Sequence, residues 1–119
     1  MNILFLDDDL DRCRKMVSWL PNVTAVLGAE SCIRLLESKP WGLVFLDHDL
    51  GFPNTGGVVA DHIARYELKV GAVAIHSRNI AGSRRMEEVL TKAGYPVRQV
   101  CFNDLPAELE ELMAWAAEK

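Results

Sequence analysis

Apolar runs and amphipathic stretches alternate five times along the 119 residues of the chain. The apolar runs predict short buried strands at residues 3–6, 23–27, 43–46, 73–75 and 97–102. Apolar residues that recur every three or four positions predict a helix after each strand, at about 10–20, 31–39, 58–68, 81–93 and 106–116. Continuous apolar strands separated by helices are typical of a parallel sheet covered on both faces. The sequence therefore predicts an α/β fold, a single (βα)5 domain over residues 1–119.

The composition narrows the class of protein. Half of the residues are hydrophobic and 25% are charged, which supplies a core without disulfides or a structural metal. The formal net charge of −4 disfavours extended nucleic-acid binding and anionic membranes. No apolar run is long enough to span a membrane, and the first residues do not resemble a signal peptide. We expect a cytoplasmic protein whose three cysteines are small core residues.

Polar residues follow the predicted strands at the points where these strands end. Ligands of parallel α/β sheets bind beyond the carboxyl ends of the strands, so the residues at these points are the candidates for function. They are Asp7, Asp8 and Asp9 after the first strand, Asp47, His48 and Asp49 after the third, His76, Ser77, Arg78 and Asn79 after the fourth, and Asn103 and Asp104 after the fifth.

Carboxylates that collect at one sheet edge repel one another unless a cation or protons neutralise them. Hard oxygen ligands with one open side suit Mg²⁺ or Mn²⁺, and an imidazole among them shifts the preference toward Mn²⁺, Fe²⁺ or Zn²⁺. We therefore predict a site for a divalent metal, Mg²⁺ or Mn²⁺, with the ligands Asp7, Asp8, Asp47 and Asp49. Asp9 and Asp104 precede predicted helices, and we interpret both as helix caps.

Three segments resemble the receiver domains of bacterial response regulators. "ILFLDDD" is similar to the acidic end of their first strand, "PWGLVFLDHDL" to the segment that carries the phosphorylated aspartate, and "VAIHS" to the fourth strand with its hydroxyl residue. The resemblance implies a flavodoxin-like, three-layer sandwich with a parallel sheet in the order 2-1-3-4-5. It also implies roles by position: Asp7 and Asp8 as the metal-binding pair, Asp47 as the phosphoacceptor, and Ser77 as the hydroxyl that senses the phosphoryl group.

The chain departs from ordinary receivers in two respects. Receivers place a lysine at the end of the fifth strand, whereas this region reads "VRQVCFNDLP", and its Arg98 is expected to point off the strand. The histidines in "LDHDLG" and "IHSRN" are atypical of ordinary receivers, and with "LDDD" these segments resemble a divergent branch, the cyclic-phosphate-processing receiver domain. That name implies an activity on cyclic phosphates.

The candidate residues can serve such an activity. Two imidazoles, His48 and His76, can divide proton transfer between the attacking water and the leaving oxygen. Ser77 and Asn79 can donate hydrogen bonds to a phosphate oxygen, and Arg78 can partly replace the missing lysine. We predict metal-dependent hydrolysis of a cyclic or diester phosphate by activated water. The ligand would be a phosphate-containing small molecule or the cyclic-phosphate end of an RNA.

Two other functions remain open. In the first, Asp47 accepts a phosphoryl group from a histidine kinase, and the domain acts as a phosphorylated switch toward a partner protein. In the second, the chain is a pseudo-receiver that binds proteins and whose acidic residues have no catalytic role. The glycine-rich segment 51–57 could cradle a phosphate, although it lacks the lysine of a P-loop.

Overall fold

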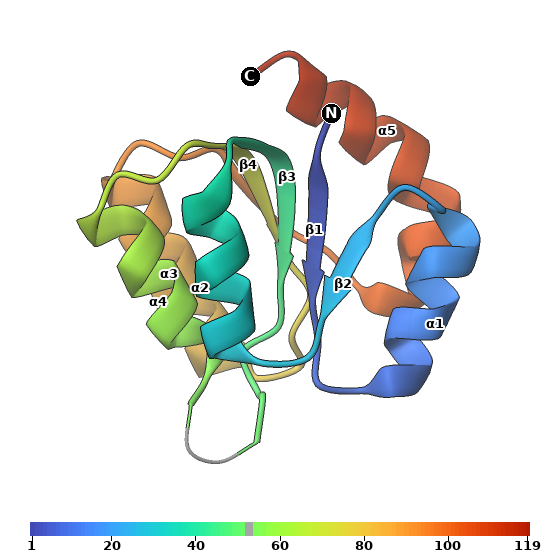
Figure 1. The fold of residues 1–119 in the computed structure, drawn as a ribbon, viewed down its shortest axis with the longest axis horizontal. Coiled ribbons are helices and arrows are strands. Elements are labelled where there is room, and N and C mark those ends of the chain that lie inside the picture. Colours follow the sequence, from blue (N-terminus) through green and yellow to red (C-terminus); the bar gives the residue numbers. More distant parts are fainter. Residues whose placement is uncertain (52–53) are drawn as a thin grey trace.

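The computed structural model describes residues 1–51 and 54–119, in which strands and helices alternate (Figure 1). The elements are β1 (Ile3–Leu6), α1 (Leu10–Trp19), β2 (Thr24–Val26), α2 (Ala29–Ser38), β3 (Trp41–Leu46), α3 (Gly56–Arg65), β4 (Val70–Ile75), α4 (Ile80–Lys92), β5 (Val97–Gln99), a 3₁₀ turn (Phe102–Asp104) and α5 (Leu105–Ala117). The strands form one parallel sheet in the order β2-β1-β3-β4-β5. The predicted flavodoxin-like fold is confirmed.

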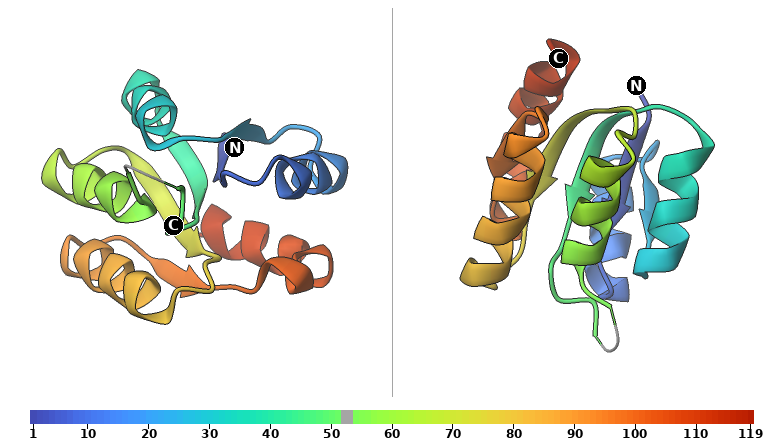
Figure 2. Two further views of the ribbon diagram at one scale, coloured as in Figure 1. Left: turned by 90° about the horizontal axis from the view of Figure 1, so that it is seen from below. Right: turned by 90° about the vertical axis from the view of Figure 1, so that its left-hand side faces the viewer.

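The sheet is the middle layer of three. Helices α2, α3 and α4 cover one face and α1 and α5 cover the other (Figures 1 and 2). Successive strand residues serve opposite faces: Leu4 and Leu6 pack toward α2, α3 and α4, whereas Ile3 and Phe5 pack toward α1 and α5. Because both faces are buried, the central strands contain only apolar residues and glycine, which is why no alternation is visible in their sequences.

The strand ends differ from the prediction in ways that hydrogen bonding explains. β3 starts at Trp41 and β4 at Val70, earlier than predicted, because these two residues pair with each other across the sheet. The glycine that follows each of them interrupts the apolar run and hides the start of the strand. The edge strands β2 and β5 have 3 residues each. β5 ends at Gln99 instead of residue 102, since the chain then turns into the 3₁₀ segment.

Several smaller expectations have clear outcomes. Asp9 caps α1, because its side chain accepts a hydrogen bond from the backbone N–H of Arg12 at 3.0 Å. Asp104 occupies the N-cap position of α5, but its side chain accepts no capping hydrogen bond. Arg98 points off β5, with its guanidinium 4.5 Å from the ring centroid of Trp115.

Two cysteines, Cys13 and Cys32, are buried as expected, but the expectation is wrong for Cys101, which is exposed. This residue lies beyond the end of β5, where the chain has left the sheet. In the part of the chain that the structure describes, no helix has the length and apolar character to cross a membrane.

Candidate functional site

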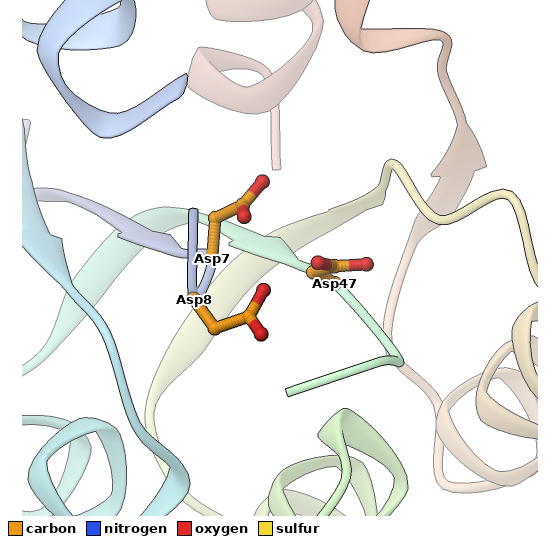
Figure 3. A group of neighbouring side chains, drawn as sticks. All are labelled: Asp7, Asp8 and Asp47. Atoms are coloured by element: carbon orange, nitrogen blue, oxygen red, sulfur yellow. The ribbon is translucent and has the colours of Figure 1, made fainter. Parts of the chain in front are cut away.

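The carboxylates of Asp7, Asp8 and Asp47 converge at the carboxyl end of the sheet (Figure 3). β1 and β3 are neighbours, and the pairing of Leu6 with Leu46 makes both strands end at the same level. One carboxylate oxygen from each residue lies within 4.8 Å of the other two. Asp7 is fully buried and Asp47 is 5% exposed, whereas Asp8 faces solvent. Three of the four predicted acidic residues therefore converge, without Asp49, and these three form what we call the carboxylate trio.

Arg12 of α1 is a member of the site that the sequence reasoning missed. Its Nε donates to Oδ2 of Asp7 at 2.7 Å, and its Nη2 donates to Oδ1 of the same carboxylate at 3.0 Å. Nη2 also lies 3.8 Å from Oδ2 of Asp47, and Nη1 lies 3.5 Å from Oδ2 of Asp9. A bidentate pair of this kind holds a guanidinium in a fixed orientation. Arg12 thus supplies the positive charge that allows Asp7 to be buried.

Burial and charge act on the titration of the trio. Desolvation and, to a lesser extent, the negative charge of Asp7 raise the pKa of Asp47 to about 6 against the opposing effect of Arg12. The hydrogen bond to Asp7 raises the pKa of Arg12 above its usual value, so this guanidinium stays charged. Asp47 therefore ionises less readily than an ordinary aspartate, and a cation bound beside it would favour its charged form.

His76 joins the same site from the end of β4. Its ring stacks on Phe5 at 4.8 Å between centroids, and its Nε2 lies 3.2 Å from the carbonyl oxygen of Leu6. Because a carbonyl can only accept, Nε2 carries the proton and Nδ1 has a free lone pair. This Nδ1 is buried without a hydrogen-bond partner among the described residues and lies 3.7 Å from Oδ2 of Asp7. Burial lowers the pKa of His76 to about 4, so the imidazole is neutral at pH 7.

A cavity of about 590 Å³ opens beside the trio. Ser77 and Arg78 line it, as the sequence predicts, together with Arg12. On the side of β5, where ordinary receivers have a lysine, the wall consists of Val100, Cys101 and Phe102, with Asn103 beyond them. The lysine in the described lining is Lys15, which comes from α1. The cavity has the size of a small-molecule site and a cationic rim next to an acidic floor.

His48 lies elsewhere. Its ring packs against Gly57 and Gly82 and lines a second cavity of about 140 Å³ between α3 and α4. Its Nδ1 lies 2.9 Å from Oδ1 of Asp49, and the side-chain amide of Asn79 donates to that same oxygen at 3.2 Å. In the described residues His76, and not His48, borders the carboxylate trio. The two imidazoles therefore do not face one site.

Asp49 and Asn79 have structural partners of their own. The hydrogen bonds from His48 and Asn79 lower the pKa of Asp49. The Asp49 carboxylate is 64% exposed and lies at the rim of the larger cavity, outside the group of three that could share an ion. Oδ1 of Asn79 accepts from the backbone N–H of Gly82 at 2.8 Å and so caps α4. The amide of Asn79 is thus engaged in capping α4 and in contacting Asp49.

The segment 51–57 covers the second half of the connection from β3 and the first two residues of α3, and its residues 52 and 53 lie outside the described residues. At its end the backbone N–H of Gly56 donates to the carbonyl of His48 at 2.7 Å. A Cβ atom at Gly56 would lie 1.8 Å from the backbone oxygen of Asp47. The start of α3 is therefore held against the end of β3, and only glycine fits there.

Solved structures share this fold over nearly the whole chain. The N-terminal domain of a Wolinella succinogenes protein matches with a TM-score of 0.77 and 18% identity over 99% of this chain and 94% of its own. The Vibrio cholerae chemotaxis protein CheY4 matches with 0.75 and 10% over 97% of each chain. The Thermotoga maritima response regulator TrrA, solved in complex with Mg²⁺ and BeF, matches with 0.71 and 20% over 98% of this chain and 99% of its own. These likenesses show that the chain shares its fold with a response regulator and a chemotaxis protein.

A family model identifies the family of this chain. The model of the cyclic-phosphate processing receiver domain matches residues 2–92, and the chain belongs to that family. The matched residues include the carboxylate trio, Arg12 and His76. None of the curated proteins matches the chain. The resemblance noted in the motifs around Asp7, Asp47 and His76 is thus confirmed at the level of the family.

Proposed function

We propose that this domain binds a divalent cation at the carboxylate trio and hydrolyses a cyclic or diester phosphate in the adjoining cavity. The observation that carries the proposal is the cavity of about 590 Å³ that opens directly beside the trio. A phosphorylated switch needs room for a phosphoryl group alone, whereas a pocket of this size accommodates a ligand as large as a nucleotide. The name of the family, cyclic-phosphate processing receiver domain, supports the same chemistry.

The trio fits a hard divalent cation, Mg²⁺ or Mn²⁺. Three carboxylates offer oxygen ligands at one place, and Asp8 at the solvent side leaves the site open to water and substrate. Nδ1 of His76 has no hydrogen-bond partner among the described residues and lies beside Asp7. This arrangement also supports a positively charged ligand at the site. When bound, such an ion polarises a phosphate oxygen and makes a coordinated water more acidic.

Residues of the chain would supply the proton acceptor and the phosphate-binding groups that hydrolysis requires. Neutral His76 can accept a proton at Nδ1 from water near Asp7, and its bond to Leu6 fixes the tautomer. Ser77 and Arg78 line the cavity and can bind phosphate oxygens. His48 does not reach this cavity, so we assign it a positioning role, because it holds Asp49 at the rim.

The proposal is tested by incubating the protein with Mg²⁺ or Mn²⁺ and a panel of 2′,3′- and 3′,5′-cyclic nucleotides and RNA with cyclic-phosphate ends. We expect turnover of at least one ester that stops on chelation and in Asp8→Asn. Asp8 is exposed, so this substitution leaves the core intact. Asp61→Asn is the matched control, because Asp61 is an exposed aspartate that lines the other cavity. A folded protein that turns over no ester with either metal would contradict the proposal.

A second candidate function is a phosphorylated switch, and the position of Asp47 favours it. This carboxylate lies at the end of β3 beside the other two acids, as the phosphoacceptor does in receivers, whose usual partner is a histidine kinase. Incubation with acetyl phosphate and Mg²⁺ would then add the mass of one phosphoryl group to the protein, but not to Asp47→Asn. A domain that binds neither metal nor phosphate would instead be a pseudo-receiver that acts through protein contacts.

A further inference from the structure

Arg12 is a cation at the centre of a site that is suited to another cation. Its Nε and Nη2 donate to the two oxygens of Asp7 at 2.7 and 3.0 Å, and Nη2 lies 3.8 Å from Asp47. Asp7 is fully buried, so water does not compete for these oxygens. A metal ion that takes an oxygen of Asp7 must share it with Arg12 or displace one of the two hydrogen bonds.

The charges of the site indicate that Arg12 and a metal ion belong to it together. When ionised, the three carboxylates of the trio carry three negative charges, and Arg12 compensates for one of them. The remainder matches the charge of one divalent cation. Arg12 therefore need not leave the site when the ion arrives, and if the ion displaces one of the two hydrogen bonds to Asp7, one arm of the guanidinium is free for another partner.

The cavity places that partner within reach. The side chain of Arg12 is 38% exposed and lines the large cavity beside the trio. The β5 side of this cavity offers Val100, Cys101 and Phe102 instead of a cationic side chain. Arg78 also borders the cavity but is exposed, and no ion pair in the described residues holds it in place. A guanidinium fork matches two phosphate oxygens, and Arg12 is the one that the site already holds in a fixed orientation.

We propose that Arg12 is the phosphate-binding residue of this site and that it rests on Asp7 and Asp47 until a divalent cation takes over part of their charge. The inference rests on the proposed function and deepens it, since it assigns the side chain that replaces the lysine of ordinary receivers. One residue thus neutralises the carboxylates of the metal-free protein and recognises the anion in the metal-bound protein. Both duties follow from its position between the trio and the cavity.

Calorimetric titrations of Mg²⁺, and then of inorganic phosphate into the Mg²⁺-saturated protein, test the two duties separately. In Arg12→Gln we expect Mg²⁺ to bind more tightly, by roughly tenfold, because a nearby positive charge is gone. We expect phosphate to bind roughly 10- to 100-fold more weakly, since a charge-assisted pair is lost. Arg12→Lys keeps the charge without the fork, so its Mg²⁺ affinity stays near that of the wild type and its phosphate affinity is intermediate.

Arg14→Gln is the matched control. Arg14 is an exposed arginine of the same helix that makes no ion pair in the described residues, so its loss changes the net charge equally without touching the trio. We expect both affinities to remain unchanged in this variant. If Arg12→Gln instead weakened Mg²⁺ binding and left phosphate binding intact, Arg12 would merely orient Asp7 and the inference would be overturned.

A measurement on the wild-type protein covers the case in which Arg12→Gln does not fold. The Nε–H resonance of Arg12 reports the 2.7 Å hydrogen bond to Asp7, and we expect it to shift on addition of Mg²⁺ and to shift again with phosphate. If this resonance shifts neither with Mg²⁺ nor with phosphate, the inference is overturned.

The outcomes also separate this inference from the proposed function. If the two affinities change in opposite directions while no ester is hydrolysed, the role of Arg12 stands and hydrolysis is wrong. If esters are hydrolysed but phosphate affinity is unaffected in Arg12→Gln, hydrolysis stands and the role of Arg12 is wrong. A wild-type protein that binds neither Mg²⁺ nor phosphate would contradict both.

Discussion

The direction in which a side chain leaves the end of a strand decides its role in this site. Asp7, Asp47 and His76 each follow the last residue of a strand. Strand residues alternate between the two faces, and Leu6, Leu46 and Ile75 pack toward α2, α3 and α4. The next residue in each case therefore turns toward α1 and α5. The side chains of Asp7, Asp47 and His76 lie close together because all three point to this same face of the sheet.

His48 has the opposite parity, which explains its separate location. It follows Asp47 and so returns to the side of α3 and α4, where its ring lines the smaller cavity. His48 entered the predicted site because it follows the third strand and belongs to the motif "LDHDLG", while the alternation along β3 would have excluded it. The identities of Asp7, Asp8 and Asp47 were predictable from the sequence, because their placement requires only the order of the strands.

Arg12 could not be selected from the sequence with equal ease. α1 carries Arg12 and Arg14, and either could have faced the acids. The rotation of the helix decides between them, and it is set where Asp9 caps the first turn by accepting from the N–H of Arg12. A residue at this third position after the cap points back toward the end of β1. That capping geometry is the signal that the composition of the helix does not reveal.

Removal of the buried charge of Asp47 should stabilise the metal-free protein. The pKa of Asp47 is raised to about 6, so the folded state binds its proton more tightly than the unfolded chain does, and the ionised form costs stability above that pH. We expect Asp47→Asn to be more stable than the wild type by about 1–3 kcal/mol at pH 7.5, with the gain vanishing near pH 4. Urea unfolding in a chelator measures it, with Asp61→Asn as the control. An equal or lower stability at pH 7.5 would show that the pair with Arg12 dominates.

His76 should make the protein sensitive to acid. Its pKa is lowered to about 4, so the unfolded chain takes up the proton more readily, and stability is lost as the pH falls from about 6.5 toward 4. His76→Gln keeps a donor for the carbonyl of Leu6 but cannot titrate. We expect the loss of about 1–3 kcal/mol over this range to be smaller in the variant. Identical pH profiles from urea unfolding of both proteins would refute this expectation.

At the scale of elements, the ends of β3, α3 and α4 are joined through His48. A Cβ atom at Gly82 of α4 would lie 2.4–2.6 Å from three atoms of the His48 ring. Asp47 and His48, directly after β3, are therefore held from two sides, by this contact with α4 and by the approach of Gly56 to Asp47. The sequence shows these glycines, but it does not show which side chain lies against them.

The contact between His48 and Gly82 predicts strong coupling between substitutions. Gly82→Ala should destabilise the protein by about 1–3 kcal/mol through displacement of the ring, partly offset by the better helix propensity of alanine. In a His48→Ala background the clash is absent, and we expect the same change to be neutral or stabilising. Urea unfolding of the four proteins gives the coupling energy. Equal effects in both backgrounds would mean that the ring does not rest on α4.

At the scale of the whole molecule, the fold was predictable because five apolar strands separated by helices admit few arrangements. The strand order and the two covered faces agree with this expectation. The element ends were less predictable, since β3 and β4 are extended by pairing across the sheet and β5 is shortened by a turn. Long-range pairing leaves little trace in a local window of sequence.

Metal binding should stabilise the entire domain, because the carboxylate trio joins two neighbouring strands of the sheet. A ligand at 100 times its dissociation constant adds about 2.7 kcal/mol, which raises the Tm of a domain of this size by roughly 10 °C. We expect Mg²⁺ or Mn²⁺ to produce this rise in thermal unfolding and a chelator to reverse it. Asp8→Asn should respond much less, and Asp61→Asn should respond like the wild type. A Tm that changes with neither metal would contradict the binding of a divalent cation at the carboxylate trio.

The two edge strands of the sheet are short, and this affects whether molecules of the domain associate with one another. β2 and β5 have 3 residues each, and β5 carries Arg98 and Gln99 on exposed positions. The unpaired N–H and C=O groups of an edge strand can pair with a strand of a neighbouring molecule. Edge strands that are short and charged disfavour this pairing. Short edge strands thereby disfavour fibrillar self-association of the domain, while the acidic site at the ends of the inner strands stays open.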